Sequence, residues 1–103
     1  IQKSPEIIMA KAPEDKYYTN VMLAQSADLL LTLKGIECSF AIGYLEEGKV
    51  GISARSLGNI NVQLIMEELG GGGHLANAAT QIEGINLDEA LERLNDAIDK
   101  ITS

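Results

Sequence analysis

The chain has 103 residues, of which 46% are hydrophobic, so it is long enough for one folded domain with a modest core. Its 15 acidic and 8 basic residues give a net charge of −7, which argues against a general nucleic-acid surface but leaves room for a small phosphorylated ligand. The sequence has no run of 18 apolar residues, so we expect no membrane span, and its single cysteine excludes an internal disulfide and a cysteine metal cluster.

The first part of the chain predicts a strand followed by a helix. Residues 7–12 form a short apolar run between two prolines, which indicates a strand. Residues 17–34 are mostly apolar and too long for one strand; Thr19 or Asn20 can cap a helix there, and Gly35 can end it. Because this helix is apolar around much of its circumference, we expect the rest of the domain to cover it well.

Residues 36–55 change to a period of two, which is typical of a β-hairpin. Apolar residues alternate with small or polar ones on both sides of a turn at residues 46–49. Because side chains alternate across a strand, Ser53 and Arg55 point to the same side, opposite the aliphatic side chains of the second strand.

The second half of the chain predicts a helix, a strand and a final helix. Asn61 can cap a helix whose apolar stripe ends at Leu69, and a strand follows at residues 77–82. An amphipathic helix begins after Asn86 and runs to the C-terminus. The order β-α-β-β-α-β-α predicts an α/β (α+β) fold, with one mixed sheet and helices packed on its faces.

Four consecutive glycines, Gly70 to Gly73, precede His74, the only histidine of the chain. Glycine loses more backbone entropy on folding than any other residue, so such a run is costly inside an ordered domain. Gly70 can serve as the stop of the preceding helix, whereas Gly71, Gly72 and Gly73 need another explanation. We interpret them as a segment whose backbone approaches a ligand and turns its N–H groups toward an oxyanion.

Other polar residues could complete an anion site with this run. Arg55 can bind phosphate through two parallel N–H bonds, and His74 can donate to phosphate or stack on a base. The alternative is a flexible glycine loop with a surface histidine and with Arg55 in a salt bridge, and the residues alone leave both interpretations open. Further neutral donors are available at Ser53, Ser56, Asn61 and Asn77.

Metal and nucleophile chemistry find little support in these residues. One histidine and one cysteine cannot supply a convergent zinc or manganese site, and the acidic residues follow helix faces and turns. No nucleophile-elbow motif surrounds Ser53 or Ser56, and the glycine run lacks the patterns of Walker-type and dinucleotide-binding loops. We therefore predict no catalytic residue and no metal ligand within this chain.

Three stretches of the chain resemble the DHHA1 subdomain of DHH-family phosphoesterases: Gly51 to Ser56, Asn61-Val62, and Gly70 to His74 with Asn77-Ala78-Ala79. The resemblance covers nearly the whole chain, and a glycine-histidine motif preceded by an SxRS strand at this spacing is specific. The motif and the residues after it look most like those of membrane-anchored cyclic-di-AMP phosphodiesterases of Gram-positive bacteria. The family also includes oligoribonucleases acting on very short RNA and modules appended to alanyl-tRNA synthetases.

The resemblance implies a two-lobed phosphodiesterase of which residues 1–103 are the substrate-binding DHHA1 lobe, a C-terminal fragment of a larger protein. A preceding DHH lobe would hold two metal ions, typically manganese, that activate water for hydrolysis of a cyclic dinucleotide such as cyclic-di-AMP. The DHHA1 lobe would close over the cleft and grip the nucleotide. Carried onto this chain, the resemblance assigns substrate binding to Ser53, Arg55, Ser56, Asn61, Gly71, Gly72, Gly73, His74 and Asn77.

The chain contains no DHH motif, so we expect the isolated fragment to be inactive and to bind no cofactor of its own. The resemblance also implies a cytoplasmic domain, without direct membrane contact, of a parent protein that is anchored in the cell membrane and could form a homodimer. Two alternatives stay open. One is the lobe of an oligoribonuclease or 3′-phosphoadenosine phosphatase; the other is a non-catalytic RNA-binding or assembly module, against which the acidic balance weighs.

Overall fold

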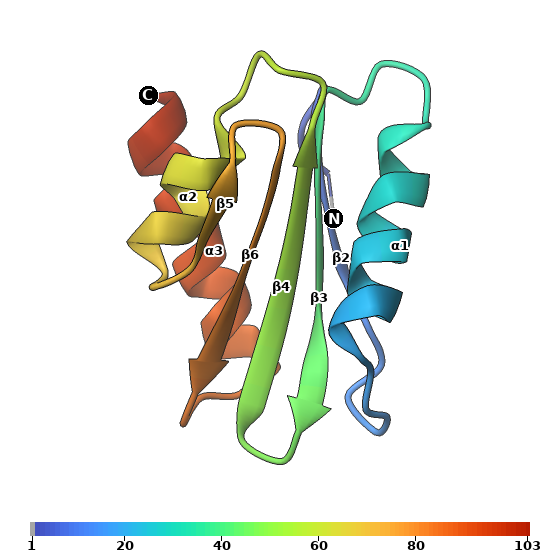
Figure 1. Ribbon diagram of the computed structural model, residues 1–103, viewed down its shortest axis with the longest axis vertical. Helices are drawn as coiled ribbons and strands as arrows, with labels where there is room; N and C mark the ends of the chain where they lie inside the picture. Colours follow the sequence, from blue (N-terminus) through green and yellow to red (C-terminus); the bar gives the residue numbers. More distant parts are fainter. Residues whose placement is uncertain (1) are drawn as a thin grey trace.

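Residues 2–103, which this computed structural model describes, form one six-stranded sheet between two helical layers (Figure 1). Helix α1 packs on one face, against β3 and β4, while α2 and α3 pack together on the other. The strand order is β1-β2-β3-β4-β6-β5, with β2 and β3 parallel and the other neighbours antiparallel. The elements are β1 (Gln2–Ser4), β2 (Ile7–Lys11), α1 (Asn20–Leu31), β3 (Cys38–Glu46), β4 (Lys49–Ser56), α2 (Val62–Glu68), β5 (Gly72–His74), β6 (Asn77–Glu83) and α3 (Leu87–Thr102).

The predicted fold class and the predicted order of the main elements are confirmed. The sequence does not predict the three-residue strands β1 and β5, which form the two edges of the sheet. β5 falls within the glycine-histidine run, where a loop was the expectation. Glycine has a low strand propensity, and three residues are too few to show an alternating pattern, so pairing with β6 is what makes this segment a strand.

The helices begin at the predicted caps. Thr19, Asn61 and Asn86 precede α1, α2 and α3, and each side-chain oxygen accepts a hydrogen bond from a backbone N–H of the first turn. Such a cap stabilises a helix by about 1 kcal/mol. Helix α1 ends earlier than expected, at Leu31, and Gly35 turns the chain beyond it with a φ of +84°.

The main core lies between the sheet and the pair α2 and α3. Alternate side chains of β3 and β4, such as Phe40 and Ile52, point into it because successive residues of a strand face opposite sides. The apolar stripe of α3 covers them with Leu94 and Ile98, which are fully buried. This layer lies on one face of the sheet and contains most of the buried apolar side chains.

The opposite face of the sheet is lined by small residues, which lets α1 approach closely. A Cβ placed on Gly51 would lie 2.9 Å from the side chain of Leu45 and 3.0 Å from that of Leu23. Ser39 donates a hydrogen bond of 2.6 Å to the carbonyl oxygen of Ala27 in the helix. The helix is therefore held by a small second core and by a buried serine hydroxyl.

The expectation that the first helix would be well covered is wrong. Leu23 and Ala27 are buried, but Val21 and Leu29 are 64% and 71% exposed on the outer side of α1. A helix resting on one sheet face buries a single stripe, and the apolar residues of α1 extend beyond that stripe. Among the described residues, none of the helices has the length and apolar character needed to cross a membrane.

We expect Leu94→Ala to lower the free energy of unfolding by about 2–5 kcal/mol, because it leaves a cavity in the main core. Glu92→Ala, at an exposed position of the same helix, should change it by less than about 0.5 kcal/mol. Denaturant unfolding followed by circular dichroism measures both variants. Similar losses in the two would contradict this assignment of the core.

Burial raises the pKa of the Cys38 thiol from 9.0 to about 12. The unfolded chain therefore loses this proton at lower pH than the folded chain, so stability should fall as pH rises from about 9 toward 12. The slope from this one group is at most about 1.4 kcal/mol per pH unit. Unfolding of the wild type and of Cys38→Ala at pH 8, 9 and 10 isolates it, since only the wild type should show the extra loss. Equal pH dependence of the two would count against a shifted thiol.

Candidate functional site

The C-terminal half of β4 places Arg55 on the face of the sheet that carries α1. Ser53 and Arg55 lie on the same side of β4, as the sequence predicts. Val50 and Ile52 point into the main core on the other face. Ser53 is 5% exposed, whereas Arg55 reaches the surface beside α1. Its Nε donates to Oδ1 of Asp28 at 2.7 Å, and its Nη1 donates to the carbonyl oxygen of Ala54 at 2.9 Å.

The pairing register brings three predicted residues into one line across the sheet. Arg55 of β4 lies opposite Asn77 of β6, and Asn77 lies opposite His74 of β5. Residues directly opposite each other in antiparallel strands project on the same face, with Cβ atoms about 4.5–5.5 Å apart. Arg55, Asn77 and His74 therefore form a polar row on the α1 side, and both Asn77 and His74 are exposed.

The next row of the same face contains small residues. Ser53 lies opposite Ala79, and Ala79 lies opposite Gly72. Helix α1 rests on β3 and β4, and Ala79 is exposed on the part of the sheet beyond them. We call the surface made by the polar row together with Ala79 and Gly72 the platform; His74, Asn77 and Ala79 are exposed on it, and Gly72 is partly exposed.

Gly70 ends helix α2, as the sequence predicts. It has a φ of +83°, and its N–H donates to the carbonyl oxygen of Glu67 at 3.1 Å. The N–H of Gly71 donates to the carbonyl oxygen of Met66 at 2.8 Å. This pair of bonds is the Schellman motif, which satisfies the last carbonyl groups of a helix and favours glycine at the left-handed position.

Gly71, just before β5, and Gly73, within β5, are required by the close approach of this segment to β6. A Cβ on Gly71 would lie 2.2 Å from the carbonyl oxygen of Ala79, and one on Gly73 would lie 2.5 Å from that of Asn77. Gly73 also has a φ of +145°. A side chain at either position would collide with backbone, so the sheet itself accounts for these two glycines.

Gly72 differs from Gly71 and Gly73, because a side chain at this position would collide with no other part of the fold. Its φ is not positive, and among the described residues outside its immediate chain neighbours no atom lies within 4 Å of a Cβ placed there. The register puts that position on the platform, next to Ala79. Of the glycines expected to approach a ligand, Gly72 is therefore the one without an internal structural reason to be glycine.

Ser53, Gly71 and Gly73 are not part of the platform, because Ser53 is buried and the two glycines pack against β6, and two further predicted site residues lie away from it. Ser56 continues the alternation of β4 to the opposite face, where it is buried, and its Oγ accepts a hydrogen bond of 2.9 Å from the N–H of Gly58. Asn61 caps α2 through Oδ1, which accepts from the N–H of Leu64 at 3.3 Å. The structure gives both residues local structural contacts and does not bring them together with Arg55 and His74.

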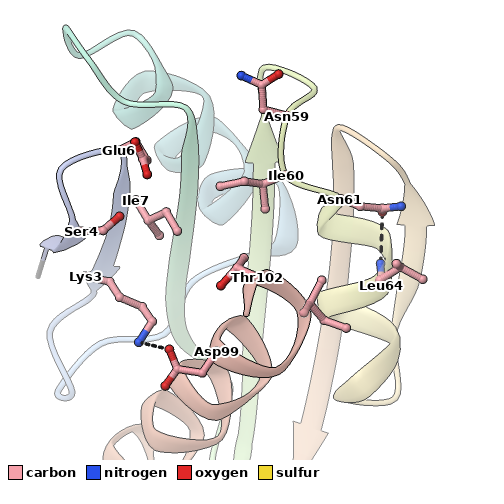
Figure 2. A pocket seen from close by; sticks show the side chains of 11 residues that line it. Lys3, Ser4, Glu6, Ile7, Asn59, Ile60, Asn61, Leu64, Asp99 and Thr102 are labelled. Carbon is pink, nitrogen blue, oxygen red and sulfur yellow. Dashed lines mark hydrogen bonds and ion pairs between the residues drawn. The ribbon is translucent and has the colours of Figure 1, made fainter.

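Asn61 instead lies at the rim of a hollow of about 650 Å³ between the N-terminal strands, α2 and the end of α3 (Figure 2). The one lysine of this hollow, Lys3, is held by Asp99, with 2.7 Å between Nζ and Oδ1. The hollow therefore presents an ion pair that is already satisfied, and it lies on the side of the sheet that carries α2 and α3.

The residues described here do not form a metal centre. Among residues 2–103, no group of three or more His, Cys, Asp and Glu side chains gathers where it could hold a metal ion. His74 lies in the polar row with an arginine and an amide rather than with carboxylates. No chemical step is assigned to a metal bound by this chain.

The sequence analysis does not single out Asp28, which contacts Arg55. Asp28 is the single charged residue between Asn20 and Leu31, in a helix that the sequence predicts to be apolar around much of its circumference. That isolation is the one signal in the sequence that marks it.

Residues 5–100 match the DHHA1 domain family. The chain belongs to this family. The predicted resemblance to the DHHA1 subdomain is thereby confirmed, and the platform with its glycine-histidine strand lies within the matched region.

The relatives come from different branches of the family. Cyclic-di-AMP phosphodiesterase GdpP of Bacillus subtilis is 55% identical over 96 residues, which cover 91% of this chain and 15% of that protein. The bifunctional oligoribonuclease and PAP phosphatase NrnA of Thermus thermophilus is 35% identical over 95 residues, 89% of this chain and 28% of that protein. The C-Ala domain of Aquifex aeolicus alanyl-tRNA synthetase shares the fold, with a TM-score of 0.64 at 16% identity and coverage of 90% and 88%.

The chain thus spans about 15% of the length of the GdpP protein that it matches. It corresponds to a DHHA1 domain, and the relatives named above include a cyclic-di-AMP phosphodiesterase and an oligoribonuclease.

We predict opposite outcomes for alanine at two adjacent glycines. Gly71→Ala should lower the free energy of unfolding by about 2 kcal/mol or more, because its Cβ would collide with the backbone of β6. Gly72→Ala should change it by less than about 1 kcal/mol, since its Cβ points into open space. Parallel urea titrations compare the two variants. Equal destabilisation would contradict the open space around the Cβ position of Gly72.

Proposed function

We propose that this chain is the substrate-binding lobe of a two-lobed DHH/DHHA1 phosphodiesterase that hydrolyses cyclic-di-AMP. The observation that carries the proposal is the row of Arg55, Asn77 and His74 beside the open positions Ala79 and Gly72. The 55% identity to the B. subtilis cyclic-di-AMP phosphodiesterase supports this choice of substrate.

The residues of the platform suit a nucleotide. A guanidinium binds phosphate oxygens through parallel charged hydrogen bonds, and an amide and an imidazole add neutral or charged donors one strand further along. Ala79 and Gly72 leave the sheet surface low, so a sugar or base can lie close to the backbone of β5 and β6. In this proposal, Arg55 takes the phosphate, and His74 and Asn77 take the phosphate or base next to it.

The chemical step belongs to the other lobe in this proposal. A preceding DHH lobe of the same chain would hold two metal ions, manganese in our expectation, which supply activated water. The exposed apolar side of α1, with Val21, Met22 and Leu29, is the kind of surface that protein partners cover, and it supports a lobe or subunit contact. The parent would be anchored in the membrane with this domain in the cytoplasm, and it could be a homodimer.

A second candidate is hydrolysis of short linear RNA or of 3′-phosphoadenosine nucleotides. It is favoured by the 35% identity to NrnA and by the open shape of the platform, which does not select a closed ring by itself. The third alternative is an RNA-binding or assembly module, and the fold shared with the C-Ala domain is compatible with it. The charge of −7 weighs against an extended RNA surface.

The proposal is tested by alanine substitutions in the full-length parent protein. Arg55→Ala and His74→Ala should each lower kcat/KM for cyclic-di-AMP about 10- to 100-fold, the effect expected for a lost hydrogen bond to a charged group. Arg93→Ala removes an exposed arginine of α3, and it should leave turnover within about twofold. Unchanged kcat/KM in both platform variants would overturn the site.

The same preparation decides between the substrates. Turnover of cyclic-di-AMP, linear di-adenylate and 3′-phosphoadenosine is compared at equal enzyme concentration, and the proposal expects the highest kcat/KM for the cyclic dinucleotide. A preference for a linear substrate would replace it with the second candidate.

A further inference from the structure

Helix α1 directs its single charge at the platform. Asp28 lies on the side of α1 that borders the end of β4, and its Oδ1 is 2.7 Å from Nε of Arg55. The two residues are 27 positions apart in the sequence, so the contact depends on how the helix rests on the sheet. Asp28 is 61% exposed, whereas Arg55 is 14% exposed, which leaves the arginine enclosed and its partner largely in solvent.

The contact with Asp28 holds the guanidinium in place and leaves some of its N–H donors free. Of its five N–H bonds, one on Nε goes to Asp28 and one on Nη1 goes to the carbonyl oxygen of Ala54. Among the described residues, no acceptor takes the other three, two of which are on Nη2. A guanidinium held at Nε and at Nη1 has a defined plane, and its free N–H bonds remain for an anion on the platform.

We propose that Asp28 is a positioning residue: it holds Arg55 in the orientation in which the guanidinium meets a substrate phosphate at the platform. The proposal rests on the proposed function, because it assigns Asp28 a role through Arg55. The positioning role goes beyond the proposed function, because it names a residue of α1 that touches no substrate and yet sets the affinity for the phosphate. Without Asp28, the flexible arginine side chain would have to be ordered by the substrate itself, and binding would weaken by that entropy cost.

Other ion pairs of the chain also join different elements, such as Lys11 with Asp88, while Arg93 with Glu89 joins neighbouring turns of one helix. In both of these pairs each side chain is at least one-third exposed, and such pairs contribute little to stability. The Asp28 contact joins a helix to the strand that bears the row of predicted ligand-binding residues. Because Asp28 is mostly in solvent, the high dielectric constant of water weakens its repulsion of an incoming phosphate.

The test is a set of variants in the full-length parent, assayed with cyclic-di-AMP and with linear di-adenylate. Asp28→Asn should raise KM about 5- to 20-fold with kcat within about twofold, and Asp28→Ser should do the same. Asp28→Glu should recover most of the loss. Asp15→Asn, which removes one carboxylate from the exposed turn before α1, is the matched control and should behave like the wild type.

Calorimetric binding of the two dinucleotides to metal-free parent gives a readout that does not depend on turnover. Kd should rise with Asp28→Asn by the same factor as KM, while the melting temperature stays within about 2 °C, as expected for an exposed ion pair. A fall in the melting temperature of clearly more than 2 °C in both Asp28→Asn and Asp28→Ser would assign Asp28 to structure and overturn the proposal.

The double variant Asp28→Asn with Arg55→Ala separates the failures. The proposal expects it to match Arg55→Ala alone, because Asp28 acts only through Arg55. An additional loss in the double variant, or tighter binding in Asp28→Asn, would overturn the positioning role. If Arg55→Ala itself changes neither KM nor Kd for either dinucleotide, the proposed site fails; if Arg55→Ala weakens binding while Asp28→Asn equals Asp15→Asn, only the positioning role fails.

Discussion

The register of β6 between β4 and β5 is the constraint on which the candidate site depends. It lines up Arg55, Asn77 and His74 from three strands on one face of the sheet. A shift of one residue would turn Asn77 into the main core and bring Ala78 to the surface, because the side-chain period of a strand is two. The burial of Ala78, Thr80 and Ile82 fixes that register, so the buried side of β6 determines where Asn77 lies on the exposed side.

The edge strand β5 meets this constraint only because Gly73, within it, and Gly71, just before it, lack side chains. The backbone of Gly71 and Gly73 comes so close to β6 that a Cβ at either position would touch a carbonyl oxygen. This close approach carries His74 to the position opposite Asn77. The glycine run thus combines a helix stop at Gly70, sheet packing at Gly71 and Gly73, and an open position at Gly72.

The sequence predicted the main elements, the helix caps and the common side of Ser53 and Arg55, because these follow from local periodicity and hydrogen-bonding groups. It could not predict β5, since a strand of three residues is formed by its partner rather than by its own composition. It grouped Ser56 and Asn61 with the site as neutral donors and through the resemblance, whereas their positions depend on strand alternation and on a helix start. Asp28 was missed because its contact with Arg55 is a tertiary one.

The two faces of the sheet differ in what they bury. The α2 and α3 face holds nearly all of the large buried side chains, so the opposite face is free to present small residues, a closely packed helix and the polar row. That arrangement makes an open, one-sided surface, whereas sites for small molecules usually enclose most of the ligand. For the proposed function, the second wall has to come from another lobe, which would face the hydrogen-bond donors that the platform offers for a phosphate.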